Sequence, residues 1–457
     1  MSTDKQGDAG WINHLPAIVK KRFAGRPYLQ QVVGNTGWIF ADNIGRMLIG
    51  LIVGIWVARY LGPVFFGDLN FALSLVAVFS VMASLGMDNN VVRDLVREPT
   101  KQNEILGTAF RLKLIGSILM AVACIGLVWV LRQKDSQMIW LTAILSFGMV
   151  FLALETISLW FRSQVQSKYT VYAKTAAYLI GALIRIILVL RQAPLIAFAW
   201  AVLIESIVGS AGLIYVYMRK DGRTFRAWTA SWSRAMSILQ DGWPALLTAV
   251  NSMLYLRLDM VMLGEMSGDR AVGIYAVATR LSEVWYFLPM AIVSSVLPSL
   301  VQTREHSREL YLARLAQLYR LMSAISILVS LSVMFLAKSV ITLLYGAQYQ
   351  EAGAVLAVHI WASVAVFLGV ASGQYLILEN LQKLSFYRTA LGLACNVLLN
   401  LMLIPPLGPL GAAIATLVSY SVAAFSVILF PQARLQATLM LQSLLPSQWR
   451  LLIKHSV

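Results

Sequence analysis

The sequence predicts an all-α integral membrane protein built from two related halves of six transmembrane helices each. Hydrophobic residues make up 59% of the 457 residues and charged residues only 13%, against about 25% charged in an average soluble domain. Apolar windows of membrane-spanning length recur along the whole chain, and two short motifs occur twice at almost the same offset. These observations exclude a soluble globular fold. The net charge of +16 is therefore interpreted as loop charge that orients the chain in the membrane, and not as a sign of nucleic-acid binding.

Twelve apolar windows are long enough to cross a bilayer, which takes about 20 residues per helix. Lipid cannot satisfy exposed backbone polar groups, and the windows are far longer than the alternating segments of a barrel, so each is expected to be a helix. Residues 37–218 form the N-lobe and residues 242–430 the C-lobe. In order, the windows are 37–60, 66–87, 106–131, 138–161, 170–190, 195–218, 242–264, 272–298, 316–337, 352–379, 388–404 and 410–430.

Three segments outside the windows are amphipathic: residues 1–36, the linker 219–241 and the tail 431–457. They mix basic residues with Trp and Leu, so we expect them to lie on the inner leaflet. Most lysines and arginines outside the windows, including Arg388 at the start of the eleventh, share the side of these segments, which predicts cytoplasmic termini. The basic residues of the opposite side are Arg132, Lys134, Arg191, Arg270 and Lys338.

The repeated motifs relate the two halves. Gly37-Trp38 opens the first window and Gly242-Trp243 the seventh, while Phe66-Gly67 opens the second and Val272-Gly273 the eighth. Six windows separate the paired motifs, and an even number returns the chain to the same side of the membrane. The halves are therefore expected to be parallel repeats about an axis along the membrane normal, with a substrate site between them.

Charged side chains inside the windows are the strongest functional signal, because one near the bilayer centre costs at least ~2.5 kcal/mol. Arg46, Arg257 and Arg280 all fall near the middle of their windows at a rise of about 1.5 Å per residue. Arginine suits phosphate because its planar fork donates two parallel hydrogen bonds. We therefore predict that these three arginines bind an anionic substrate.

Internal pairing is the alternative interpretation. Asp42 and Arg46 are four residues apart, and Arg280 and Glu283 are three apart, so each pair could neutralise itself on one helix face. Asp259 points away from the arginine two positions before it, because such residues lie on different faces of a helix. Both interpretations stay open.

Other side chains in the windows are secondary candidates. Glu205, near mid-span, is the best placed acid for ion coupling, whereas Glu155 and Glu379 lie near cytoplasmic loops and are expected to pair with Arg162 and Lys383. The full set of candidates for ion coupling or local pairing is Asp42, Glu205, Asp259 and Glu283. Aromatic residues near the arginines could stack on sugars, although Trp and Tyr also populate membrane interfaces; they are Tyr255, Trp285 and Tyr286.

Motifs for catalysis are missing. The chain has no G-x-x-x-x-G-K-[ST] loop for ATP, no nucleophile elbow and no zinc-protease motif, and its four histidines lack metal-ligand spacing. His359 is interpreted as a packing residue or part of a water-filled cleft in preference to a proton relay. We therefore predict a transporter and not an enzyme, with no metal or cofactor.

Three stretches resemble one family: ARYLGPVFFGDLNFALS (58–74), VGIYAVATRLSEV (272–284) and NVLLNLMLIPPLGPLGAAIATLVS (396–419). They are similar to segments of Wzx-type O-antigen and exopolysaccharide repeat-unit flippases, which belong to the multidrug/oligosaccharidyl-lipid/polysaccharide (MOP) exporter superfamily. The resemblance covers residues 37–430. It implies two six-helix lobes around a central cationic cavity, in which Arg46, Arg257 and Arg280 fit by type and depth.

The resemblance also implies an activity. Such proteins flip undecaprenyl-diphosphate-linked oligosaccharides across the bacterial inner membrane by alternating access, driven by an ion gradient or the membrane potential. The partners expected are this lipid-linked oligosaccharide, membrane lipids and a polysaccharide polymerase complex, with no nucleic acid, and the transporter is expected to be a monomer.

Two other functions are compatible with parts of the pattern. A drug or cation antiporter of the same superfamily should have an acidic cavity, which three central arginines argue against. A membrane-embedded glycosyl polymerase or ligase would carry its chemistry in a large periplasmic loop, and all loops between the windows are short.

Overall fold

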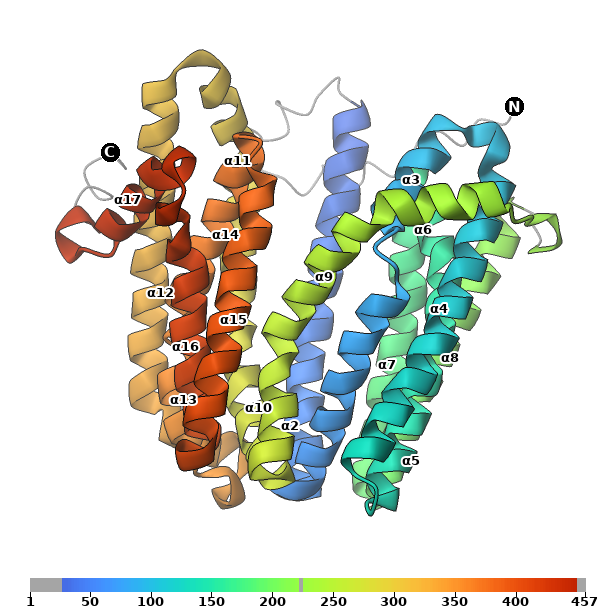
Figure 1. Ribbon diagram of the computed structural model, residues 1–457, viewed down its shortest axis with the longest axis horizontal. Coiled ribbons are helices and arrows are strands. Elements are labelled where there is room, and N and C mark those ends of the chain that lie inside the picture. The colour runs from blue at the N-terminus through green and yellow to red at the C-terminus, as the bar shows by residue number, and fades with distance from the viewer. Residues whose placement is uncertain (1–26, 222–224, 450–457) are drawn as a thin grey trace. The chain divides into compact units, whose positions relative to one another are not determined.

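The computed structural model describes residues 27–221 and 225–449, with side chains described from residue 44 onward apart from Asp221. Within these ranges every regular element is a helix (Figure 1). The all-α prediction is confirmed. Eleven helices of the described residues are long and apolar enough to cross a membrane.

The difference between eleven helices and twelve windows lies at one junction. Helix α2 (Pro27–Ala83) continues through both of the first two windows, and the candidate span there runs from Ile44 to Arg97. Inside α2, Gly62 has φ 72° and ψ 172°, a backbone conformation that glycine adopts without a Cβ penalty, and Pro63 follows it. The two windows thus meet directly at Gly62 with no loop between them.

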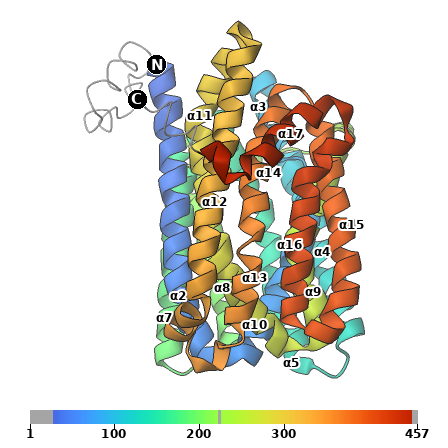
Figure 2. The ribbon, with the colours of Figure 1, turned by 90° about the vertical axis from the view of Figure 1, so that its left-hand side faces the viewer.

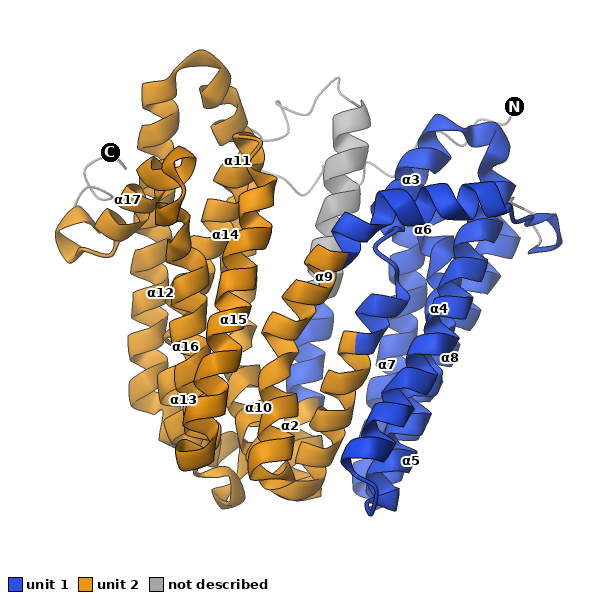
Figure 3. Cartoon of the chain, in the orientation of Figure 1, with its two compact units in different colours: residues 1–53, 79–246 blue, residues 54–78, 247–457 orange. Residues whose placement is uncertain are grey.

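The chain divides into two compact units, which Figure 3 colours separately. Unit 1 comprises residues 1–53 and 79–246, and unit 2 comprises residues 54–78 and 247–457. The second half of the first window and the first half of the second therefore group with unit 2. Helix α9 (Trp232–Ser267) contributes its beginning to unit 1 and the rest to unit 2.

Unit 1 is held by an aromatic and aliphatic core. Trp228, predicted as part of an interfacial linker, is only 9% exposed and donates its indole N–H to the Tyr217 hydroxyl at 3.1 Å, whereas Trp232 is 79% exposed. The linker thus packs partly into the core. The elements that lie wholly in this unit are α3 (Asp88–Arg97), η2 (Pro99–Lys101), α4 (Gln102–Leu131), α5 (Ser136–Phe147), η3 (Gly148–Glu155), α6 (Thr156–Ser163), α7 (Lys168–Leu190), α8 (Leu195–Asp221) and η4 (Phe225–Ala227).

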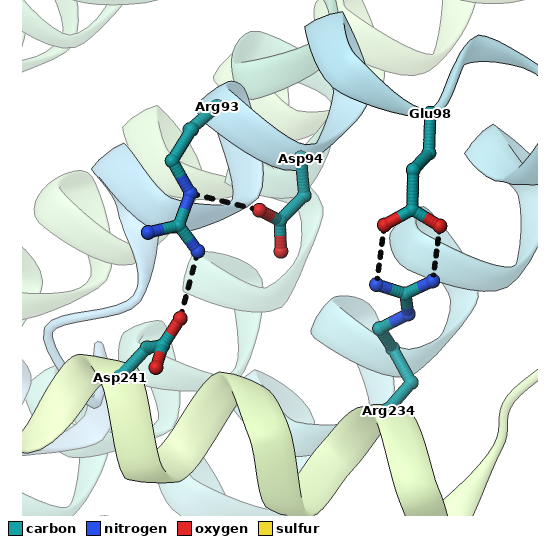
Figure 4. A network of polar contacts seen from close by, with 5 residues as sticks. All are labelled: Arg93, Asp94, Glu98, Arg234 and Asp241. Atoms are coloured by element: carbon teal, nitrogen blue, oxygen red, sulfur yellow. Dashed lines mark hydrogen bonds and ion pairs between the residues drawn. The ribbon is translucent and has the colours of Figure 1, made fainter.

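Ion pairs fasten the beginning of α9 to α3 inside unit 1 (Figure 4). Arg234 donates two parallel hydrogen bonds to the carboxylate of Glu98, at 2.9 and 2.8 Å. Arg93 donates to Asp241 at 2.7 Å and to its neighbour Asp94 at 2.9 Å. The bonds from Arg234 lower the pKa of Glu98 to about 2, so this carboxylate stays charged well into the acidic range.

Unit 2 has a larger core that includes the C-terminal helix α17. Gln436, Ala437 and Met440 of α17 are fully buried, and the Tyr319 hydroxyl donates to Gln436 Oε1 at 3.0 Å. Figure 2 shows α17 lying across the same end of α12 and α14. The elements of this unit are α10 (Asp269–Glu283), η5 (Val284–Tyr286), α11 (Phe287–His306), α12 (Arg308–Tyr345), η6 (Ala347–Tyr349), α13 (Ala352–His359), α14 (Ala362–Leu378), α15 (Gln382–Leu407), α16 (Pro409–Phe425), η7 (Ser426–Leu429), η8 (Pro431–Ala433) and α17 (Arg434–Ser443).

Helices α2 and α10 pack at backbone contact in unit 2. A Cβ on Gly67 of α2 would lie 1.8 Å from the carbonyl oxygen of Asp269, and a Cβ on Gly273 of α10 would lie 1.9 Å from that of Pro63. Neither position accepts a larger residue without moving a backbone. The glycines of the repeated motifs Phe66-Gly67 and Val272-Gly273 are therefore the two that bring α2 and α10 together.

Candidate substrate site

The contact between α2 and α10 positions Arg280. This arginine lies two helical turns after Gly273, and its guanidinium rests over Gly54 of α2: a Cβ there would be 2.5 Å from Nη1 and 2.6 Å from Cζ. Gly50, one turn earlier, likewise faces a side chain, because its Cβ would meet the Tyr178 hydroxyl in unit 1. Glycines at this spacing usually form a notch between helix backbones, but these two leave room for polar side chains.

Arg257 and Arg280 come together around one acid. Glu283 lies one turn after Arg280 on α10, and both guanidinium groups attract its carboxylate. All three side chains are half-buried. Arg257 and Arg280 thus act on the same carboxylate, as does Asp259, and the role of the two arginines in substrate binding stays a prediction.

Arg46 belongs to the other unit. It is half-buried on the part of α2 that lies in unit 1. The side chain of its predicted partner, Asp42, lies outside the described residues. The pairing of Asp42 with Arg46 therefore stays a prediction.

Asp259 is the centre of a buried polar network in unit 2. Its side chain is 5% exposed and accepts three hydrogen bonds, from Tyr275 at 2.8 Å, from Thr416 at 2.6 Å and from Asn400 at 2.6 Å. These donors come from α10, α16 and α15, and all three are neutral. Asn400 also donates to Asn396 Oδ1 at 3.0 Å. Four helices thus meet at one carboxylate.

The other predicted acids have nearby cationic partners. Glu205, the acid ranked first for ion coupling, accepts from Arg185 on the adjacent helix α7 at 2.6 Å, and Gly181 makes room for its carboxylate. Glu155 pairs with Lys174 at 2.6 Å in place of Arg162. The predicted pairing of Glu379 with Lys383 is also wrong, since Glu379 pairs with Arg304 at 3.3 Å and with Arg308 at 3.7 Å.

The aromatic candidates differ in how they are placed. Tyr255 stacks on Tyr420 with ring centroids 4.5 Å apart, so one of its faces is already covered by protein. Trp285 and Tyr286 are half-buried in the short helix η5, directly after Glu283. Along the chain all three aromatic residues adjoin the cluster, since Tyr255 lies two residues before Arg257.

Arg388 is a buried cation that the sequence pattern did not reveal. Its position predicts a cytoplasmic loop charge, but α15 begins six residues earlier, and Arg388 is 9% exposed. Its guanidinium donates to Ser372 Oγ and to the Gly369 carbonyl oxygen, both at 3.1 Å on α14. A charge this deeply buried is costly unless it is well hydrogen-bonded.

Two spans in corresponding positions of the halves are irregular. The fourth window contains η3, eight residues of 3₁₀ helix, and the tenth is interrupted between α13 and α14 beside His359. His359 is buried and its Nδ1 lies 3.0 Å from Ser282 Oγ, which agrees with its interpretation as a packing residue. Interrupted helices at matching positions of a repeat are a feature of transporters.

The predictions that the chain holds no metal ion and does not use ATP stay predictions. Among the described residues, no group of three or more His, Cys, Asp or Glu side chains is arranged to hold a metal ion. The chemistry available in the cluster of Arg257, Arg280 and Glu283 is the binding of charge.

The fold of this all-helical chain is similar to that of solved membrane transporters. Two solved structures match nearly its whole length at 15% identity. One, the lipid II flippase MurJ in an inward closed conformation, has a TM-score of 0.69 and covers 91% of this chain and 93% of its own. The other is an inward-facing multidrug resistance MATE family transporter of the MOP superfamily. Its TM-score is 0.64, and the match covers 87% of this chain and 96% of the transporter. At this identity the likeness shows the fold.

The chain belongs to the polysaccharide biosynthesis protein family, whose sequence profile matches residues 32–304. A protein of Haloferax volcanii named a probable flippase, AglR, is 26% identical over 404 residues, which are 83% of this chain and 79% of that protein. A putative O-antigen transporter of Shigella dysenteriae is 23% identical over 321 residues, 69% of this chain and 78% of that protein. The family resemblance seen in the sequence is confirmed, and the two relatives are named as a flippase and a transporter.

Proposed function

We propose that this protein flips undecaprenyl-diphosphate-linked oligosaccharide repeat units across the bacterial inner membrane, by alternating access, for the synthesis of a cell-surface polysaccharide. The observation that carries the proposal is the cluster of Arg257, Arg280 and Glu283 inside the spans, in a chain of the polysaccharide biosynthesis family. The names of the two relatives, a flippase and an O-antigen transporter, support the same class of substrate.

The two guanidinium groups of the cluster favour an anion over a cationic drug. A diphosphate offers the several oxygens that a planar guanidinium fork binds best, and the cluster presents two such forks. In this proposal Glu283 holds the two arginines between transport cycles, and the diphosphate competes with it for them. A MATE-like antiporter remains the alternative, because its fold is the same.

The driving force is proposed to be an ion gradient or the membrane potential. Of the acids considered, Asp259 is the one best placed to take up a cation or proton, since it is buried and its three hydrogen-bond partners are neutral. Glu205 is less suited because Arg185 neutralises it. The expected cytoplasmic termini, the complex with a polysaccharide polymerase and the monomeric state belong to the same proposal.

The test is an export assay in cells that lack their own repeat-unit flippase. Arg257→Ala, Arg280→Ala and the double variant should abolish surface polysaccharide while the folded protein stays in the membrane. The matched control is Arg59→Ala, which removes an exposed arginine of α2, and it should export normally. Wild-type export by all three arginine variants would refute the cluster as the substrate site. Protection of the cells from cationic dyes would favour the antiporter.

A further inference from the structure

Unit 2 contains a cavity of about 650 Å³ that the proposed transport function does not use. It lies among the first turn of α10, the last third of α12, η6 and the first turns of α13. This is the end of unit 2 opposite α17, which packs against α12 at Tyr319 and Ser323 (Figure 1). Its volume is in the range of small-molecule sites, about 300–1,000 Å³.

The wall of the cavity divides into an apolar and a charged part. Met334 and Phe335 of α12 with Ala354 of α13 form the apolar part, and Phe335 is 78% exposed on a membrane-spanning helix. Lys338 lies three residues after Phe335, so the wall changes from lipid-facing to cationic within one helical turn. Gly353 lets α13 pack closely against this turn of α12, because a Cβ at residue 353 would lie 2.9 Å from Lys338 Cα.

The charged part carries groups of both signs. Arg270 on α10 donates to Glu351 at 2.7 Å, and both side chains are more than half exposed. Lys338 adds a second cation on the facing helix. A guanidinium has five N–H donors and an ammonium three, so Arg270 and Lys338 can hold a phosphate while Arg270 keeps its bond to Glu351.

We propose that this cavity binds the headgroup of an aminophospholipid. The phosphodiester lies against Lys338 and Arg270, its primary ammonium faces Glu351, and the first methylenes of an acyl chain lie on Phe335 and Ala354. Inorganic phosphate offers the same acceptor oxygens but would leave the apolar wall unused. A lipid from the surrounding leaflet uses both parts of the wall, because the cavity joins the lipid-facing surface of α12.

The test measures lipid retention by the full-length protein in detergent, using native mass spectrometry and lipid-dependent melting. The probes are phosphatidylethanolamine, phosphatidylcholine, phosphatidylglycerol and inorganic phosphate. Phosphatidylethanolamine should bind best, since phosphatidylcholine has no N–H donor for Glu351 and phosphatidylglycerol has no amine. Inorganic phosphate alone should neither bind detectably nor raise the melting temperature.

Variants assign the effect to the cavity. Lys338→Gln should weaken phosphatidylethanolamine binding about tenfold, the effect of one lost charge-assisted hydrogen bond, and Glu351→Gln should remove the preference over phosphatidylcholine. Lys383→Gln, which deletes an exposed lysine on α15, should change neither. Wild-type binding by Lys338→Gln and Glu351→Gln, or equal stabilisation by inorganic phosphate, would overturn the proposal. Export is not the readout, so failure here leaves the transport proposal standing.

Discussion

Replacing Gly54 by alanine tests whether the Arg280 guanidinium is held where the structure has it. The added Cβ would lie 2.5 Å from Nη1 and 2.6 Å from Cζ of Arg280, whereas carbon atoms make optimal contact at about 3.5–4.0 Å. Either the guanidinium moves by about 1 Å or α2 and α10 separate. A binding group tolerates displacement of only about 0.5 Å, so we expect Gly54→Ala to impair export as strongly as the loss of the arginine.

A control variant separates this clash from the change in helix propensity. Gly45→Ala lies on the same helix, and its Cβ would meet nothing within 4 Å. Alanine is favoured over glycine in a helix interior by about 1 kcal/mol, which applies to both variants. Only at Gly54 must a guanidinium, the end of a flexible side chain, move out of the way of the new Cβ. Gly45→Ala should therefore be stabilised by up to about 1 kcal/mol and export normally.

Two measurements decide the outcome: surface polysaccharide in complemented cells, and the melting temperature of the purified protein. Gly54→Ala should lose export with a melting temperature equal to or below that of the wild type. If it exports and melts like Gly45→Ala, the guanidinium does not rest over Gly54 and the position assigned to Arg280 is wrong.

Three further outcomes are expected. The pKa of Glu98 in the folded protein, about 2, lies below its ordinary value of 4.5, so its ion pair stabilises the protein fully above pH 4.5 and loses this effect as the pH falls toward 2. The melting temperatures of Glu98→Gln and the wild type should therefore converge between pH 4.5 and pH 2. A constant difference between them would contradict the ion pair of Glu98 with Arg234. Gly181→Ala places a Cβ against the Glu205 carboxylate, which must turn away from Arg185, so the variant should lose the up to about 1 kcal/mol that this ion pair contributes. Gly126→Ala, with nothing within 4 Å of its Cβ, should not, and identical thermal melts would exclude the close approach. Asp259→Ala removes the acceptor shared by Tyr275, Thr416 and Asn400, although Thr416 keeps the Ala412 carbonyl and Asn400 keeps Asn396. It should cost about 1–3 kcal/mol, and an unchanged melt would argue against the buried network.

The sequence was sufficient for features that depend on helix geometry alone. The rise per residue predicts depth, so the positions of Arg257 and Arg280 within their windows predict that both lie at a similar level of the membrane. Those windows, the seventh and the eighth, correspond to α9 and the start of the next span, α10. Composition and window length were likewise enough for the all-helical class, and only the junction at Gly62, where two windows meet without a loop, changed the helix count.

Features that depend on which helices are neighbours could not be predicted. A sequence exposes partners three or four residues apart, but Glu205 is neutralised by Arg185, twenty residues earlier on another helix. The donors to Asp259 are more remote still, and Thr416 is 157 positions away. The choice of Glu205 over Glu155 and Glu379 for ion coupling therefore rested on depth alone, and the acid that couples an ion stays a prediction.

The repeated glycines link the architecture to the site. Gly67 and Gly273 stand at matching positions of the two halves, and each lets the backbone of one helix touch the other where a Cβ would have kept them apart. Because the two helices touch at the backbone, a large side chain two turns farther along α10 has room only if the residue that faces it on α2 is also small. Gly54 is that residue for Arg280. The placement of the substrate cation thus follows from the same close packing that the repeat motif encodes, so a larger residue at Gly273 should disturb Arg280 without contacting it.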